Sequence, residues 1–268
     1  MRVALGLSYS GQAYDGWQSQ PSGRTVQDQL EMALGKFTNA ERIPTLCAGR
    51  TDAGVHALMQ VVHFDTQVER TPHAWVRGTN SYLPEDISVH WAQIVPGQFH
   101  CRASASSRRY AYVLLESPVR PSLEAHRAGW VFQPMDLGRM QQAIPYLLGE
   151  RDFSSLRASA CQALSPVKNL MRVEISQQGA YWRFDFEANA FLHHMIRNIM
   201  GCLLVIGQGK QPPAWMAEVI AARSRDAAAP TFAADGLYFL GPRYDLRWGL
   251  PERTSAYDWL PCASTATS

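Results

Sequence analysis

The sequence has few lysines, few cysteines and no long apolar run, and each shortage excludes a class of protein. The longest apolar stretch runs from Ile199 to Ile206, interrupted only by Gly201. It is far shorter than the roughly 18 residues that a membrane-spanning helix needs. No basic segment followed by a long apolar one opens the chain, so we expect neither secretion nor membrane attachment. With 46% hydrophobic and 18% charged residues among 268, the chain can bury a core, which excludes bulk disorder.

The cysteines and the basic residues point to a reduced, near-neutral protein. None of the five cysteines lies close enough in sequence to another to form a zinc or redox motif. We therefore expect reduced, mostly buried thiols and a cytoplasmic location. The basic residues are 22 arginines and 3 lysines, and the net charge is only +2. Arginine binds phosphates through two hydrogen bonds and stacks on rings. The composition is therefore compatible with a polyanionic binding partner. The sequence contains no P-loop or dinucleotide fingerprint, which agrees with a reaction that needs no redox change and no phosphoryl donor.

Hydrophobic periodicity predicts the order βαββαβ twice, the second time with an extra helix. In the first half, it predicts helices from Val26 and Pro72, and strands at Val3–Tyr9, Ile43–Ala48, Leu58–Asp65 and Ile87–Val95. In the second half, it predicts helices from Leu137 (to Leu148), His193 and Pro213, and strands at Arg109–Leu115, Met171–Ser176, Trp182–Ala188 and Gly236–Leu240. Thr25 with Asp28 resembles a capping box, and Asp136 is a second predicted N-cap.

Two βαββαβ copies are typical of the split-βαβ, ferredoxin-like order. We expect an α+β protein of two ferredoxin-like (RRM-like) halves, with antiparallel sheets that flank a central cleft. The lobes are predicted at residues 1–104 and 105–248, and a loosely packed tail at 249–268.

The most informative segment is CAGRTDAGVHA at 47–57. Gly49 and Gly54 bracket Arg50 and Asp52 between two predicted strands, and such glycines permit a tight loop with close backbone approach. One interpretation is a structural turn with an exposed ion pair worth about 0–1 kcal/mol. The other is a carboxylate nucleophile that a nearby guanidinium keeps ionised.

A second segment, SSRRYAY at 106–112, places Tyr110 and Tyr112 on one face of a predicted strand. Either the rings belong to the core, or Tyr110 stacks on an unpaired base while Arg108 and Arg109 contact phosphates.

A third segment, FLHHMIRNIMG at 191–201, predicts a largely buried helix with Arg197 on its narrow polar edge. A buried arginine needs an acidic partner, which is Asp185 or Glu187 on the preceding strand or Asp52. His193 and His194 are adjacent, so a helix cannot turn both toward one metal, and we predict no metal site.

Together these segments resemble the tRNA pseudouridine synthase A family, the tRNA pseudouridine(38–40) synthases. The resemblance spans roughly Val3 to Leu240 and is carried by YDGWQ at 14–18, TVQ at 25–27, AGRTDAGVHA at 48–57, RRYAY at 108–112, HHMIRNIMG at 193–201 and GLYFL at 236–240. Ser10 departs from the acidic or amide residue usual in the family, and residues 118–133 and the tail match nothing in it.

The resemblance implies a pseudouridine synthase fold and the conversion of uridines 38, 39 and 40 in the tRNA anticodon stem-loop to pseudouridine. It implies a homodimer that works without cofactor or metal. Asp52 would be the catalytic aspartate, acting at C1′ or C6 of the nucleotide, and Arg50 would help to extrude the nucleotide.

The same resemblance implies roles for residues outside this loop. Tyr110 would stack on the target uracil and is the candidate acceptor of its C5 proton, and Leu237 would pack on the other face of the base. Arg197 would pair with Asp52. Arg108, Arg109 and His194 complete the predicted substrate-binding set.

Two other classes of function stay open from the residues alone. The first is a non-catalytic RNA-binding protein with duplicated RRM-like lobes, which has little use for an acid such as Asp52 in a phosphate-binding groove. The second is a hydrolase with an aspartate nucleophile and His56 or His63 as base, which no spacing in the chain supports.

Overall fold

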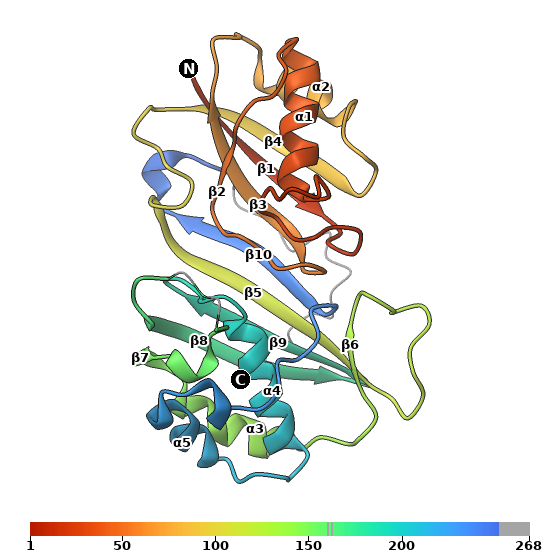
Figure 1. Ribbon diagram of the computed structural model, residues 1–268, viewed down its shortest axis with the longest axis vertical. Helices are drawn as coiled ribbons and strands as arrows, with labels where there is room; N and C mark the ends of the chain where they lie inside the picture. Colours follow the sequence, from red (N-terminus) through yellow and green to blue (C-terminus); the bar gives the residue numbers. More distant parts are fainter. Residues whose placement is uncertain (160, 162, 252–268) are drawn as a thin grey trace. The chain divides into compact units, whose positions relative to one another are not determined.

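The computed structural model describes residues 1–159, 161 and 163–251 (Figure 1). It is an α+β structure with mostly antiparallel strands, and it divides into two compact units. Unit 1 is Met1–Arg108 together with the described chain from Tyr238 onward, and unit 2 is Arg109–Leu237. Most of the predicted tail, from residue 252 on, lies outside the described residues. Within the described part of the chain, no helix combines the length and the apolar character needed to cross a membrane.

Unit 1 is a sheet with two helices. Its elements are β1 (Arg2–Tyr9), α1 (Val26–Thr38), β2 (Leu46–Cys47), β3 (His56–Asp65), α2 (Pro72–Asn80), β4 (Ile87–Val95) and all but the first residue of β10 (Leu237–Tyr244). The strand order is β4-β1-β3-β10, with β2 paired to β3. The pairs β1–β3, β1–β4 and β2–β3 are antiparallel, whereas β10 runs parallel to β3.

Strand β1 is buried on both faces because each face of the unit 1 sheet is covered. Val3, Leu5 and Leu7 point to one face, where Trp75 of α2 packs edge-on against Phe37 of α1 and Phe64 of β3. Ala4 points to the other face and belongs to a second cluster, which contains Val61, Val95 and Phe99, with Trp91, Tyr244 and Trp248 packed against it. The alternation in the sequence therefore turns the larger side chains of β1 to one buried face and a small one, Ala4, to the other.

Unit 2 combines most of β5 (Ala105–Glu116) with three further strands of a sheet. These are β7 (Gly149–Asp152), β8 (Val167–Gln178) and β9 (Tyr181–Ala188), in the order β5-β9-β8-β7, with β6 (Gly129–Val131) parallel to β5. Its helices are α3 (Leu137–Ala143), α4 (Met195–Gly207) and α5 (Trp215–Ala222). Glycine lets α3 and α4 approach closely, since a Cβ on Gly207 would lie 2.9 Å from the sulfur of Met140.

Most predicted elements are present, and the local signals explain where they begin. Thr25 accepts a hydrogen bond from the Asp28 N–H and Asp136 accepts one from the Arg139 N–H, so both predicted N-caps are confirmed. The hairpin of β8 and β9 pairs Val173 with Phe186, as the alternating pattern predicts. Cys47, Cys101, Cys161 and Cys202 are free thiols, as predicted.

Several predicted boundaries are wrong. The strand predicted at Ile43–Ala48 shortens to Leu46–Cys47, because Pro44 has no N–H to donate to a ladder. The helix predicted over Leu137–Leu148 ends at Ala143, just before Pro145, and gives way to a short 3-10 turn. The short strands β6 and β7 were not predicted from the sequence.

Candidate active site

The segment that carries Arg50 and Asp52 forms a loop between β2 and β3, and we call residues 48–55 the Asp52 loop. The N–H of Val55 donates to the carbonyl oxygen of Asp52 at 3.1 Å, which closes a turn. Gly54 has φ +79°, a value that glycine adopts without strain. Asp52 is half-buried and Arg50 is exposed. Gly54 therefore forms part of the tight turn expected from the sequence.

The YDGWQ segment supports this loop from one side through its backbone. The N–H of Trp17 donates to the carbonyl oxygen of Thr51 at 3.0 Å. Gly16 has φ +96°, and a Cβ there would lie 2.8 Å from that same oxygen and 3.2 Å from the carbonyl carbon of Asp52. A side chain at residue 16 would push the Asp52 loop away, so the glycine is required by close approach as well as by its dihedral angle.

Buried polar side chains form hydrogen bonds to residues in the Asp52 loop and next to it. The hydroxyl of Tyr9 lies 2.8 Å from that of Thr51. The amide of Gln60 donates to the carbonyl oxygen of Gly49, and Nδ1 of His56 accepts from the N–H of Gly11 at 3.1 Å. His56 also stacks on Tyr238 of β10, with ring centroids 4.8 Å apart. These contacts give His56 a structural role, which weakens the hydrolase interpretation.

Arg108 is the predicted substrate-binding residue of unit 1 that lies beside the loop. Its guanidinium donates to the carbonyl oxygen of Ala48 at 3.4 Å, to that of Ala105 at 3.3 Å and to that of Arg102. These bonds hold a positive charge at the beginning of the Asp52 loop. In unit 1, Arg108 thus contacts the beginning of the loop that carries Arg50 and Asp52.

In unit 2, Tyr110 lies on β5 and is nearly fully buried. Its ring packs edge-on against Phe191, with centroids 5.2 Å apart. Phe191 begins the segment that leads to His194 and Arg197, so this contact joins two of the sequence motifs. Arg109, the neighbour of Tyr110 on β5, is half-buried.

Arg197 of α4 holds the segment that precedes β10. Its Nε donates to the carbonyl oxygen of Phe232 at 2.8 Å, and the Phe232 N–H returns a bond to the Arg197 carbonyl oxygen at 3.1 Å. Tyr112 donates to the carbonyl oxygen of Ala233 at 3.0 Å, which fixes the same segment before it reaches Leu237. Asp185, one sequence-based partner for Arg197, forms a two-bond ion pair with Arg183.

His194 has an unusual backbone conformation at the start of α4. It is the N-cap residue with φ +62° and ψ +4°, in the left-handed region that non-glycine residues rarely adopt. Its ring lies against that of His193, with centroids 4.0 Å apart. The predicted helix start at His193 is therefore two residues early, and the strain marks His194 as a position held by its surroundings.

One group of side chains in unit 1 has the composition of a metal site. Donor atoms of His63, His100 and Cys101 all lie within 4.8 Å of one another. However, Nδ1 of His63 accepts the Cys101 N–H, and Nδ1 of His100 accepts the N–H groups of Arg102 and Ala103. Metal-binding imidazoles normally donate their second nitrogen's proton, which neither ring can do here. Burial also raises the pKa of the Cys101 thiol to about 12. These hydrogen bonds suit a structural cluster better than a metal site.

Comparison with known proteins identifies the family. The family model for tRNA pseudouridine synthase matches residues 7–102 and 143–245. The chain is 69% identical to tRNA pseudouridine synthase A of Albidiferax ferrireducens, over 97% of this chain and all of the relative. The proteins of that name from Polaromonas naphthalenivorans (69% identical) and Methylibium petroleiphilum (64%) are covered equally completely. A chain of a solved Cbf5-Nop10-Gar1 complex is a distant match, with a TM-score of 0.35 and 13% identity over 75% of this chain and 45% of that chain.

The family model matches far more than half of the sequence, and its two matched ranges contain Asp52, Arg197 and Leu237. The relatives match over their whole lengths. The chain belongs to the tRNA pseudouridine synthase family.

Proposed function

We propose that this chain converts uridine to pseudouridine at positions 38, 39 and 40 in the anticodon stem-loop of tRNA. The observation that carries the proposal is the full-length identity of 69% to relatives named tRNA pseudouridine synthase A. The Asp52 loop supports it, because a half-buried carboxylate in a rigidly held turn is what a positioned nucleophile requires.

The proposed reaction is an isomerisation that needs no redox or phosphoryl donor. The N1–C1′ bond of the nucleotide breaks, the uracil rotates, and a C5–C1′ bond forms. C5 loses its proton and N1 gains one, so no atom is lost overall. The carboxylate of Asp52 starts the sequence by acting at C1′ or C6, and Arg197 is its proposed ion-pair partner.

The remaining predicted residues bind the extruded nucleotide in this proposal. Removing a base from its stack costs a few kcal/mol. Stacking on Tyr110 offsets about 1–3 kcal/mol of that cost, and Leu237 packs on the other face of the base. Arg50 holds the vacated position, while Arg108, Arg109 and His194 contact the RNA backbone.

We also propose the ferredoxin-like halves, the lobe boundaries, the homodimer and the cytoplasmic location. The order β4-β1-β3-β2, with α1 packed beside α2, supports a ferredoxin-like first half of a pseudouridine synthase fold. Residues 1–104 and 105–248 remain our proposed lobes. A homodimer that acts in the cytoplasm follows from the resemblance to the family.

The decisive experiment replaces Asp52 with asparagine, which is nearly isosteric but cannot act as a nucleophile. We expect Asp52→Asn to keep the melting temperature and the affinity for tRNA while it abolishes tritium release from tRNA labelled at C5 of uridine. Near-normal release would refute the assignment. If the parent protein bound tRNA but released no tritium, the non-catalytic RNA-binding alternative would be correct.

A further inference from the structure

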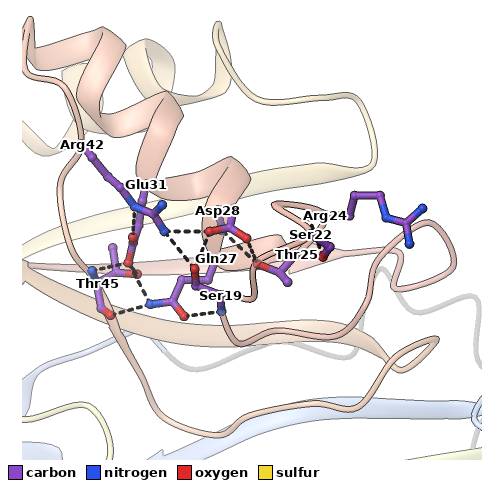
Figure 2. Close-up of polar contacts among 9 residues, drawn as sticks. All are labelled: Ser19, Ser22, Arg24, Thr25, Gln27, Asp28, Glu31, Arg42 and Thr45. Carbon is purple, nitrogen blue, oxygen red and sulfur yellow. Dashed lines mark hydrogen bonds and ion pairs between the residues drawn. The ribbon is translucent and has the colours of Figure 1, made fainter.

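A buried polar cluster joins α1 to the segments on both sides of it (Figure 2). Its centre is Asp28, Glu31 and Arg42, which we call the acid–arginine cluster. Arg42 donates from Nη2 to Oδ1 of Asp28 at 2.7 Å and from Nε to Oε2 of Glu31 at 2.5 Å. One guanidinium thus bridges two carboxylates that lie one helical turn apart on α1.

The burial of these acids makes the cluster costly to disturb. The side chains of Asp28 and Glu31 are only 5% and 4% exposed, whereas Arg42 is 41% exposed. Burial pushes the pKa of Asp28 upward, but hydrogen bonds from Ser19, Thr25 and Arg42 outweigh it and leave the pKa below its usual value. Removing the arginine would leave two buried carboxylates without a counter-ion.

The remaining bonds of the cluster reach the chain before and after α1. On one side, Ser19 donates from Oγ to Asp28 at 2.6 Å and from its N–H to the side chain of Gln27 at 3.0 Å. On the other side, Glu31 Oε1 accepts the backbone N–H of Thr45 at 2.6 Å and the Thr45 hydroxyl at 2.9 Å. Figure 2 shows that Arg42, Ser19 and Thr45 converge on the same two turns of α1.

Both of these segments lead directly to the Asp52 loop. Two residues before Ser19, Trp17 donates its N–H to Thr51 and accepts the Gln27 N–H at 3.1 Å. After Thr45 the chain enters β2 at Leu46 and continues into the loop itself. The acid–arginine cluster therefore fixes the segment that supports the loop and the segment that precedes it.

We propose that Asp28, Glu31 and Arg42 are positioning residues for the Asp52 loop, acting through Trp17 on one side and Thr45 on the other. This inference rests on the proposed function, because it assigns to the cluster the placement of the catalytic carboxylate. It predicts that damage to the cluster slows the chemical step while it leaves the binding of tRNA intact.

The test compares Arg42→Met with Arg42→Lys and with a matched control, Arg2→Met. Arg2 forms a two-bond ion pair with Asp65 at 2.9 and 2.8 Å, also in unit 1. Asp65 ends β3, nine residues beyond His56, which places it roughly 30 Å along the strand from the end of the loop at Val55. Pseudouridine formation is measured with tRNA at several concentrations, at a temperature well below the melting point of every variant.

For Arg42→Met we expect kcat to fall about tenfold, because a displacement of 1 Å at a reacting group can cost about a hundredfold. KM should stay within about twofold of the parent value. Arg42→Lys should recover part of the kcat, since one ammonium can reach a single carboxylate but cannot bridge two as the planar fork does. Arg2→Met should lose stability and keep its kcat.

A milder variant keeps the test informative if Arg42→Met does not fold. Thr45→Val removes one hydroxyl bond to Glu31 and keeps the backbone bond, and we expect its kcat to fall about threefold at unchanged KM. The inference is overturned if kcat in the cluster variants matches that of Arg2→Met, or if only KM changes. Activity in Asp52→Asn would instead overturn the proposed function, so the two failures are distinguishable.

Discussion

Replacing Gly16 with alanine tests whether the Asp52 loop is held by direct backbone contact. The added methyl group would lie 2.8 Å from the carbonyl oxygen of Thr51 and 3.2 Å from the N–H nitrogen of Ala53. A relaxed carbon–oxygen contact is about 3.3 Å, so the loop must move by roughly half an ångström. Residue 16 also has φ +96°, which costs an L-residue about 1–2 kcal/mol.

Gly23→Ala is the matched control, because it imposes backbone strain without a contact. Gly23 lies in the same connection before α1 with φ +66°, and a Cβ there would meet nothing within 4 Å. Both variants should lose about 1–2 kcal/mol of unfolding free energy from the dihedral angle alone. Only Gly16→Ala should also move Asp52, with a loss in kcat of about tenfold for a half-ångström displacement.

The assay combines urea unfolding with single-turnover pseudouridine formation on tRNA. We expect Gly23→Ala to be less stable than the parent but equally fast, and Gly16→Ala to be both less stable and slower. Equal rates in the two variants would refute the argument, because the loop would then tolerate the methyl group without a change at Asp52.

Two further predictions concern Tyr110 and His63. Tyr110→Phe keeps the ring that contacts Phe191 but removes the candidate proton acceptor, so we expect normal tRNA binding with little pseudouridine formed in single-turnover assays; turnover equal to the parent's would mean that only the ring matters. Burial, with smaller contributions from Arg2 and His100, lowers the pKa of His63 from 6.5 to about 4. Between these values the unfolded chain binds a proton that the folded chain does not, so stability is lost as the pH falls from 6.5 to 4. His63→Gln does not titrate and should flatten the dependence of the urea midpoint on pH in that window; an unchanged slope would contradict the assigned cause.

Local signals in the sequence predicted much of the fold because their physical causes are local. Thr25 and Asp136 cap helices through bonds to N–H groups three residues away, which the spacing alone indicates. The alternation in β8 and β9 specifies their hairpin for the same reason. The parallel pairing of β10 with β3 was missed, since it joins Tyr238 to His56 across most of the chain and no periodicity encodes such a pairing.

The candidate site also has a part that local sequence signals predicted and a part that depends on contacts between distant residues. Gly49 and Gly54 identified the Asp52 loop, because glycine is rarely placed in a tight turn without a conformational reason. The support that Gly16 and Tyr9 give to Thr51 depends on tertiary contacts. Only the resemblance carried by the YDGWQ segment pointed to it. The acid–arginine cluster was not predicted, because Asp28 was interpreted only as part of a capping box and Glu31 as an ordinary polar position on the helix.

The route of the chain through unit 1 has a consequence for how the protein is made. Strand β10 pairs with β3, whereas the other strands of unit 1, β1 to β4, were all synthesised before residue 96. A ribosome must therefore translate the whole of unit 2 before Tyr238 is available to stack on His56. Until then the part of β3 at His56 and Ala57 has no partner strand on the edge that β10 will join, and such an unpaired edge is prone to association with other chains. The strands of unit 1 are complete only after unit 2 has been synthesised.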